Sequence, residues 1–141
     1  MSYLLDTNIV SELRQRPGRI DVNVAAWGAG LEADEQFLSV ITVFEVELGI
    51  LQVERRDEFQ GKMLRRWFDA GVLGVFARRT LPVDREIARR AARLHSPDPK
   101  PERDAYIAAT ALVRGLTVAT RNVADFEPMG VPVFNPWVPP E

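Results

Sequence analysis

Short apolar runs that suit buried strands alternate in this chain with longer stretches whose apolar residues recur at helical spacing. The runs predict strands at residues 2–6, 36–40, 81–83, 117–119 and 131–134. The longer stretches predict helices at residues 7–14, 21–31, 42–55, 58–70, 85–94 and 104–114. Strands that alternate with helices in one short chain are typical of a parallel sheet covered by helices. We therefore expect an α/β fold with a central parallel β-sheet of about four to five strands.

Glycine and proline mark the expected ends of these elements. Gly71 and Gly74 are expected to break the helix at 58–70, and Gly115 to end the helix at 104–114. The tail from Pro136 is rich in proline and is expected to be extended. A length of 141 residues suits one domain, so we expect residues 1–141 to form a single domain that ends in this tail.

The composition excludes several kinds of chemistry. The chain has no cysteine and one histidine, so it offers no thiolate nucleophile, and a histidine-rich metal site or an internal Ser-His triad is not expected. No apolar run approaches the length of about 20 residues that a membrane span needs, and we expect a cytoplasmic protein. The net charge is −2, although 16 of the 18 basic residues are arginines. Clusters of arginine suit either solvated helix faces or phosphate binding.

Four carboxylates stand where a strand ends or a helix begins, and they are Asp6, Glu45, Asp104 and Asp125. The carboxyl ends of the strands in an open α/β sheet share one edge, and ligands bind there. Two carboxylates about 4 Å apart near a protein surface repel each other by roughly 4 kcal/mol. Four acids at one edge therefore indicate a hard divalent cation between them.

Each acid also has a purely structural interpretation. Asp6 suits the N-cap of the first helix, and the spacing Thr42-x-x-Glu45 is that of a capping box. Asp104 suits the first turn of a helix, and Asp125 suits the start of a turn. Taken singly, capping is the better explanation of each residue. Capping does not, however, explain why all four positions are expected at the same edge of the sheet.

Oxygen ligands of this kind select Mg²⁺, with Mn²⁺ as a substitute, and a metal with open water positions suits phosphodiester hydrolysis. We expect Asp6 and Asp104 to be direct metal ligands. Asp125 would complete the shell or bind a second metal, and Glu45 would orient the attacking water or hold that second metal. The roles of these two residues are interchangeable on the sequence alone. Supporting polar side chains are expected from Asn8, Thr120 and Asn122, which would orient a carboxylate or a metal-bound water.

Four ordered blocks of the chain resemble the PIN-domain ribonucleases, and within them the VapC and FitB toxins of type II toxin–antitoxin systems. The blocks are Leu4-Leu5-Asp6-Thr7-Asn8, the segment from Ser39 to Gly49, Asp104 to Ala111, and Leu116 to Asn122. The ending Val133-Phe134-Asn135-Pro136-Trp137 is similar to FitB-type members. Asp6, Glu45, Asp104 and Asp125 match the acidic quartet of the family, and Thr120 matches its hydroxyl residue.

The resemblance implies a PIN fold, a Mg²⁺-dependent endoribonuclease that cuts tRNA or rRNA, and a homodimer. It also implies a cognate antitoxin that blocks the acidic pocket, and a larger toxin–antitoxin complex on operator DNA. Arg103 departs from the usual pattern, because small or polar residues are more common before the third acid. The loop before Arg103 also carries three prolines.

Rival classes fit the residues less well. A haloacid-type phosphatase needs a second acid two residues after the first, and Asn8 occupies that position. A receiver domain needs an acidic pair and a late lysine, and neither is evident. The remaining alternative is a PIN-fold module that binds RNA or an antitoxin without cutting RNA.

Overall fold

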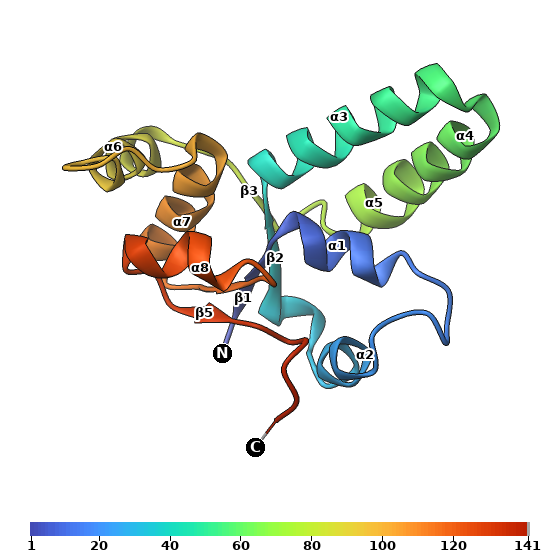
Figure 1. The fold of residues 1–141 in the computed structure, drawn as a ribbon, viewed down its shortest axis with the longest axis horizontal. Helices are drawn as coiled ribbons and strands as arrows, with labels where there is room; N and C mark the ends of the chain where they lie inside the picture. The colour runs from blue at the N-terminus through green and yellow to red at the C-terminus, as the bar shows by residue number, and fades with distance from the viewer. Residues whose placement is uncertain (141) are drawn as a thin grey trace.

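The computed structural model describes residues 1–140 and contains a parallel five-stranded β-sheet covered by helices (Figure 1). The order of strands across the sheet is β3-β2-β1-β4-β5, and all neighbouring strands are parallel. The predicted fold class and strand number are confirmed. The strands are β1 (Tyr3–Leu5), β2 (Gln36–Ser39), β3 (Thr80–Leu81), β4 (Thr117–Ala119) and β5 (Val133–Phe134).

Helices cover both faces of the sheet (Figure 1). No helix among residues 1–140 is both long and apolar enough to cross a bilayer. Three further short helical segments, η1 (Ala33–Glu35), η2 (Trp67–Val72) and η3 (Glu127–Met129), accompany the α-helices. The α-helices are α1 (Thr7–Leu13), α2 (Val22–Ala29), α3 (Val40–Arg56), α4 (Glu58–Arg66), α5 (Leu73–Val75), α6 (Arg85–Leu94), α7 (Glu102–Arg114) and α8 (Val123–Phe126).

Alternate residues of β1 supply the two halves of the core. Leu4 is fully buried among side chains of α7, α8 and β4, including Ile107 and Phe126. Leu5 points to the other face and packs with apolar residues of α1 and α3, including Ile9 and Ile50. This alternation follows from the two-residue period of a strand, and both faces are apolar because helices cover both. The short strand β1 is thus packed on both faces and lies at the centre of the fold.

The expected break after residue 70 is wrong. The helical path of α4 continues through the wide turn η2 into α5, with Gly71 and Gly74 inside it. A glycine in a helix costs only about 1 kcal/mol relative to alanine. Phe68 is buried on this path, and Trp67 and Leu73 pack against the same part of the core. Packing of the apolar side chains therefore outweighs the low helix propensity of the glycines.

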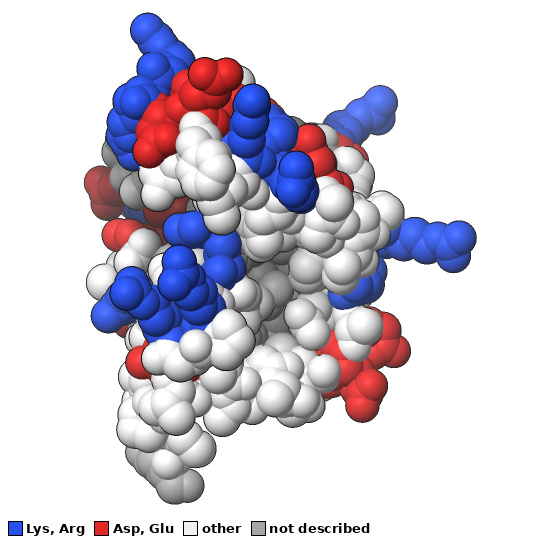
Figure 2. Space-filling view, turned by 90° about the vertical axis from the view of Figure 1, so that its right-hand side faces the viewer, with Lys and Arg blue, Asp and Glu red and all other residues white. Residues whose placement is uncertain are grey.

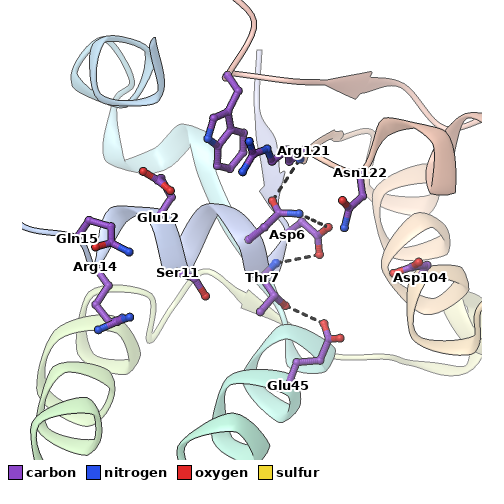
Figure 3. Close-up of a pocket in the computed structure, with 12 residues that line it drawn as sticks. Asp6, Thr7, Ser11, Glu12, Arg14, Gln15, Glu45, Asp104, Arg121 and Asn122 are labelled. Atoms are coloured by element: carbon purple, nitrogen blue, oxygen red, sulfur yellow. Dashed lines mark hydrogen bonds between the residues drawn. The ribbon is translucent and has the colours of Figure 1, made fainter. Parts of the chain in front are cut away.

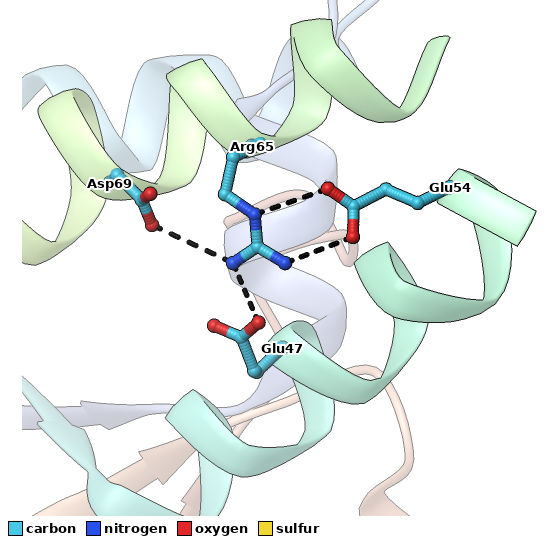
Figure 4. A network of polar contacts seen from close by, with 4 residues as sticks. All are labelled: Glu47, Glu54, Arg65 and Asp69. Carbon is cyan, nitrogen blue, oxygen red and sulfur yellow. Dashed lines mark hydrogen bonds and ion pairs between the residues drawn. The ribbon is translucent and has the colours of Figure 1, made fainter. Parts of the chain in front are cut away.

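A carboxylate network ties α4 to α3 (Figure 4). The Arg65 guanidinium lies 2.6 Å from a carboxylate oxygen of Glu47 and 3.2 Å from one of Glu54, both on α3. Asp69 in η2 lies 3.8 Å from the same guanidinium. A planar guanidinium can serve several carboxylates at once, which a lysine ammonium cannot do with the same geometry. The network fixes how α3 and α4 lie against each other.

Gly61 allows the closest approach of these two helices. A Cβ atom at Gly61 would lie 2.6 Å from Cγ and 2.8 Å from Cα of Glu54. We expect Gly61→Ala to lower the free energy of unfolding by about 1–3 kcal/mol, because the backbone of α3 must move. Urea denaturation measures the change.

Gly49→Ala is the matched control, because a Cβ at Gly49 in α3 meets no atom within 4 Å. We expect Gly49→Ala to stabilise the protein by up to about 1 kcal/mol through helix propensity. Equal effects of the two substitutions would contradict the proposed close contact.

Candidate active site

Asp6 lies at the centre of the carboxyl edge of the sheet. It follows β1, whose neighbours are β2 and β4, so the chain leaves the sheet at the point where its strand order reverses. Its side chain accepts hydrogen bonds from Thr7 N and from the Thr120 hydroxyl, both at 2.8 Å. Asp6 is therefore the N-cap of α1, and only 5% of its surface is exposed. Asp6 therefore both caps α1 and lies at the edge of the sheet where a ligand is expected to bind.

The predicted supporting residues form a hydrogen-bond network around Asp6. The Asn8 side-chain amide donates to Thr120 Oγ1 at 3.3 Å, and the backbone N–H of Asn122 donates to the same oxygen at 2.9 Å. The Thr120 hydroxyl is thus left to donate its own proton to Asp6. Asn8 lies 3.4 Å from the same Asp6 oxygen. The network holds the Asp6 carboxylate in one orientation.

Glu45 reaches this site from α3, and the capping-box interpretation of Thr42 and Glu45 is wrong. The helix begins at Val40, because Ser39 is its N-cap and accepts a hydrogen bond from Ile41 N at 3.0 Å. Glu45 therefore lies beyond the first turn and has no capping role. One of its oxygens accepts a hydrogen bond from the Thr7 hydroxyl at 2.7 Å, and the other lies 3.6 Å from the Arg103 guanidinium.

Asp104 and Asp125 lie in the first turns of α7 and α8. Helix α7 begins at Glu102, two residues earlier than expected, so Asp104 is its third residue. Burial raises the pKa of Asp104 to about 6, with additional contributions from Asp6, Asp125 and Glu45. Burial also raises the pKa of Asp6, and the charges of Glu45 and Asp125 raise it further. The four acids are therefore close enough to repel one another.

A cleft of about 430 Å³ lies at this edge of the sheet (Figure 3). Asp6, Glu45 and Asp104 line the cleft, whereas Asp125 is exposed and does not line it. Several of the residues that line the cleft were not predicted from the sequence. The only indication in the sequence that Thr7 belongs to the site was its position next to Asp6. The others are Ser11, Glu12, Arg14, Gln15, Arg121 and Trp137.

The cleft suits a hydrated hard cation better than a metal enclosed by protein ligands. Within residues 1–140, no three Asp, Glu or His side chains are arranged closely enough to hold one ion together. Mg²⁺ is usually bound by one or two carboxylates and keeps several waters, so it does not need such a cage. The raised pKa values of Asp6 and Asp104 mark a place where a positive charge would relieve repulsion. The donor set and its electrostatics fit Mg²⁺ or Mn²⁺.

The raised pKa of Asp104 gives the metal-free protein a pH-dependent stability. The pKa rises from 3.8 to about 6, so the folded chain binds the Asp104 proton more tightly than the unfolded chain does. The stabilisation by this group is complete below pH 3.8 and is lost as the pH rises toward 6. Asp104→Asn removes the titrating carboxyl group, so the variant does not lose this stabilisation as the pH rises. We expect the variant to have a higher Tm than wild type at pH 7.5 in chelator.

The difference in Tm should shrink at pH 4.5, where Asp104 in the folded wild type carries its proton and resembles asparagine. Thermal unfolding at both pH values, in the same chelator and salt, measures it. A difference that is equal at the two pH values would contradict the assigned cause.

A parallel sheet with a carboxylate cleft at its central switch point is an α/β domain of the class that binds ligands outside the carboxyl ends of its strands. The PIN domain family matches residues 3–127, and the chain belongs to that family. Within the family it is of the VapC/FitB type of toxin from toxin–antitoxin systems. The expected resemblance is thereby confirmed.

Individual relatives cover nearly the whole chain. It is 39% identical to Toxin FitB of Neisseria gonorrhoeae, over 95% of this chain and 97% of the relative. It is 36% identical to the VapC ribonuclease Y4jK of Sinorhizobium fredii, over 96% of this chain and 98% of the relative. A structure of FitAB bound to the IR36 DNA fragment superimposes with a TM-score of 0.87 at 34% identity, over 99% of this chain and 98% of that chain.

Proposed function

We propose that this chain is a Mg²⁺-dependent endoribonuclease toxin of a toxin–antitoxin module, and that residues 1–141 act as one PIN domain in the cytoplasm. The observation that carries this proposal is the meeting of three carboxylates, Asp6, Glu45 and Asp104, in one cleft at the sheet edge, where burial raises the pKa of Asp104 to about 6. A relative is named a VapC ribonuclease, which supports an RNA substrate. In keeping with the family, tRNA or rRNA is the proposed target.

Asp6 and Asp104 would hold the cation directly, and Asp125 of α8 would complete the shell through a metal-bound water. Mg²⁺, or Mn²⁺ in its place, lowers the pKa of a bound water and neutralises charge on the scissile phosphate. Thr120 and Asn8 keep the Asp6 carboxylate oriented toward the cleft. Glu45 would accept the proton of the attacking water, and the Thr7 hydroxyl positions the Glu45 carboxylate for that role.

Arg103 is the cation nearest to Glu45 in the metal-free site. Its guanidinium stacks on Phe44, 4.8 Å from the ring centroid, and lies 3.6 Å from a Glu45 oxygen. We propose that this unusual residue compensates the charge of Glu45 before RNA arrives. It then shifts to the RNA backbone, because an exposed ion pair of this length contributes at most about 1 kcal/mol and is readily exchanged.

A groove beside the cleft is the proposed antitoxin site. The groove has a volume of about 560 Å³ and lies between α4 and the loop after α1. Phe59 and Met63 of α4 line it although 75% and 59% of their surfaces are exposed. Figure 2 shows this side of the molecule, where uncharged surface borders a hollow and basic side chains stand around it. Such an exposed apolar patch is typical of a protein interface.

The groove is continuous with the acidic cleft, because Arg14 and Gln15 line both. Arg16 and Arg19 add positive charge at the other side of the groove. A segment with apolar and acidic side chains would therefore fit it, and its continuation would reach the carboxylates and block them. This geometry supports inhibition by a cognate antitoxin. Solved relatives include toxin–antitoxin complexes and a complex with DNA, which supports binding of the toxin–antitoxin complex to operator DNA.

A homodimer is also proposed. Val40, Phe44 and Leu51 on α3 are between 37% and 50% exposed, and residues 40, 44 and 51 follow a helical repeat of four and seven. A second copy of the chain would cover this apolar stripe.

The chemistry of the product ends tests the proposed reaction. Attack by water leaves either a 5′-phosphate and a 3′-hydroxyl or a 3′-phosphate and a 5′-hydroxyl, whereas attack by the ribose 2′-hydroxyl leaves a 2′,3′-cyclic phosphate and a 5′-hydroxyl. We expect cleavage of a labelled RNA that requires Mg²⁺ or Mn²⁺ and produces no cyclic phosphate. Cleavage in chelator, or cyclic-phosphate ends, would contradict the mechanism. Binding of RNA without cleavage under all metal conditions would favour the alternative, a non-cutting PIN module.

A further inference from the structure

A stacked pair of side chains stands at the rim of the acidic cleft. The guanidinium carbon of Arg121 lies 5.2 Å from the ring centroid of Trp137, and both residues line the cleft together with Asp6. Figure 3 shows Arg121 beside Asp6 and Asn122. Neither residue of the pair is needed to orient a carboxylate. The pair therefore requires an explanation other than the hydrolytic machinery.

The Trp137 ring is held in place from several sides. The backbone N–H of Trp137 donates to Asn135 Oδ1 at 2.9 Å, and its carbonyl oxygen accepts a hydrogen bond from the Asn23 side chain of α2, also at 2.9 Å. Pro136 before it is buried, and the ring packs against the core around Tyr3. The tail is thus fastened at the residue that reaches the cleft.

The backbone of Arg121 is anchored by a hydrogen bond, whereas its guanidinium group is accessible to a ligand. Its backbone N–H lies 3.3 Å from the side-chain oxygen of Asn8, which anchors it beside Thr120. The residue is exposed, and none of the ion pairs within residues 1–140 involves it, although the cleft is acidic. The guanidinium carbon lies over the Trp137 ring. The side of the guanidinium away from the ring and its N–H groups remain available to a ligand.

We propose that Arg121, held flat by Trp137, is the binding subsite for an unpaired nucleobase next to the scissile phosphate. The base stacks on the free face of the guanidinium, while an in-plane N–H group donates to the adjacent phosphate. Bases of single-stranded RNA stack on arginine planes as well as on aromatic rings, and arginine combines this plane with a charge. Trp137 is a positioning residue in this arrangement. The inference rests on the proposed function and narrows the substrate class to RNA that is unpaired at the cut.

Abasic scanning of a short RNA tests the subsite. The Asp104→Asn variant, which retains Arg121 and Trp137, is mixed with a single-stranded hexanucleotide and with copies that lack one base in turn. Salt and Mg²⁺ are held constant, because phosphate contacts depend on ionic strength. We expect one position, or two adjacent ones, at which loss of the base weakens binding by about 5- to 30-fold, the range that base stacking supports.

Three variants separate the contribution of the planar guanidinium from that of its charge. Adding Arg121→Lys should abolish the abasic penalty while much of the binding to phosphate remains. Adding Trp137→Phe should keep the penalty, and Trp137→Ala should reduce it at least about threefold, because the guanidinium loses its support. Arg90→Lys, at an exposed arginine of α6, is the control and should leave the profile unchanged. A flat abasic profile, or a profile that survives Arg121→Lys, would overturn the proposal.

Cleavage of the same hexanucleotide series by the chain with Asp104 intact distinguishes the two proposals. If a base is required at one position for binding but no RNA is cut, the subsite stands and the nuclease function fails. If RNA is cut at the same rate with every single base removed, the nuclease function stands and the subsite fails.

Discussion

Asp6→Asn is expected to lower the rate of RNA cleavage by about 10²- to 10⁴-fold, the range typical of the loss of a group that acts directly in the chemistry. Asparagine keeps the size of the side chain and an oxygen that accepts from Thr7 N. It removes the negative charge at the centre of the carboxylate cluster and replaces the oxygen that accepts from Thr120. Cleavage of a labelled RNA at saturating Mg²⁺ measures the loss, and thermal unfolding verifies that the variant is folded.

Glu12→Gln is the matched control for this experiment. Glu12 also lines the cleft, and its carboxylate accepts a hydrogen bond from Asp21 N at 2.8 Å, which a glutamine oxygen can replace. We expect the rate of this variant to stay within about twofold of wild type, since it removes no member of the quartet. Equal losses in both variants would show that cleavage depends on the total negative charge of the cleft and not on the quartet.

The double substitution Phe59→Ala and Met63→Ala is expected to weaken antitoxin binding by at least about 30-fold, as truncation of a central apolar contact does in other interfaces. Both side chains are mostly exposed, so their truncation leaves no cavity in the folded chain. RNA cleavage by the free toxin should be unchanged. Capture of the antitoxin, expressed together with the tagged toxin, measures the loss.

Val138→Ala serves as the control for exposure, because Val138 is 59% exposed and does not line the groove. If the double variant still binds the antitoxin fully, and only substitutions outside the groove abolish binding, the antitoxin occupies another face of the toxin. Loss of cleavage together with binding would mean that the groove belongs to the active site.

The placement of Asp6 and Asp104 beside one cleft was predictable because it depends on local signals joined by one topological rule. The apolar run before Asp6 and the strand before Thr120 each indicate where a strand ends, and parallel strands place those ends at one edge. Asp104 follows from the start of a strongly periodic helix. These features depend on residues that are close together in the sequence, so they can be recognised before the fold is known.

The features that were missed arise from contacts between distant residues. The predicted capping box at Thr42 is wrong because Ser39, at the end of β2, is the N-cap of α3. Gly71 failed to end a helix because packing of Phe68 and its neighbours in the core outweighs local propensity. The stack of Arg121 on Trp137 joins residues 16 positions apart, one after β4 and the other in the tail. No periodicity in the sequence signals that contact.

Cleavage of total cellular RNA by the purified, antitoxin-free chain tests the central claim most directly. The wild type is assayed with Mg²⁺ and with chelator, and Asp104→Asn is assayed in parallel with Mg²⁺. We expect discrete fragments that appear only for the wild type with Mg²⁺, and the ends of the fragments would identify the RNA target. Equal cleavage patterns from wild type and Asp104→Asn, or fragments that persist in chelator, would contradict the central claim.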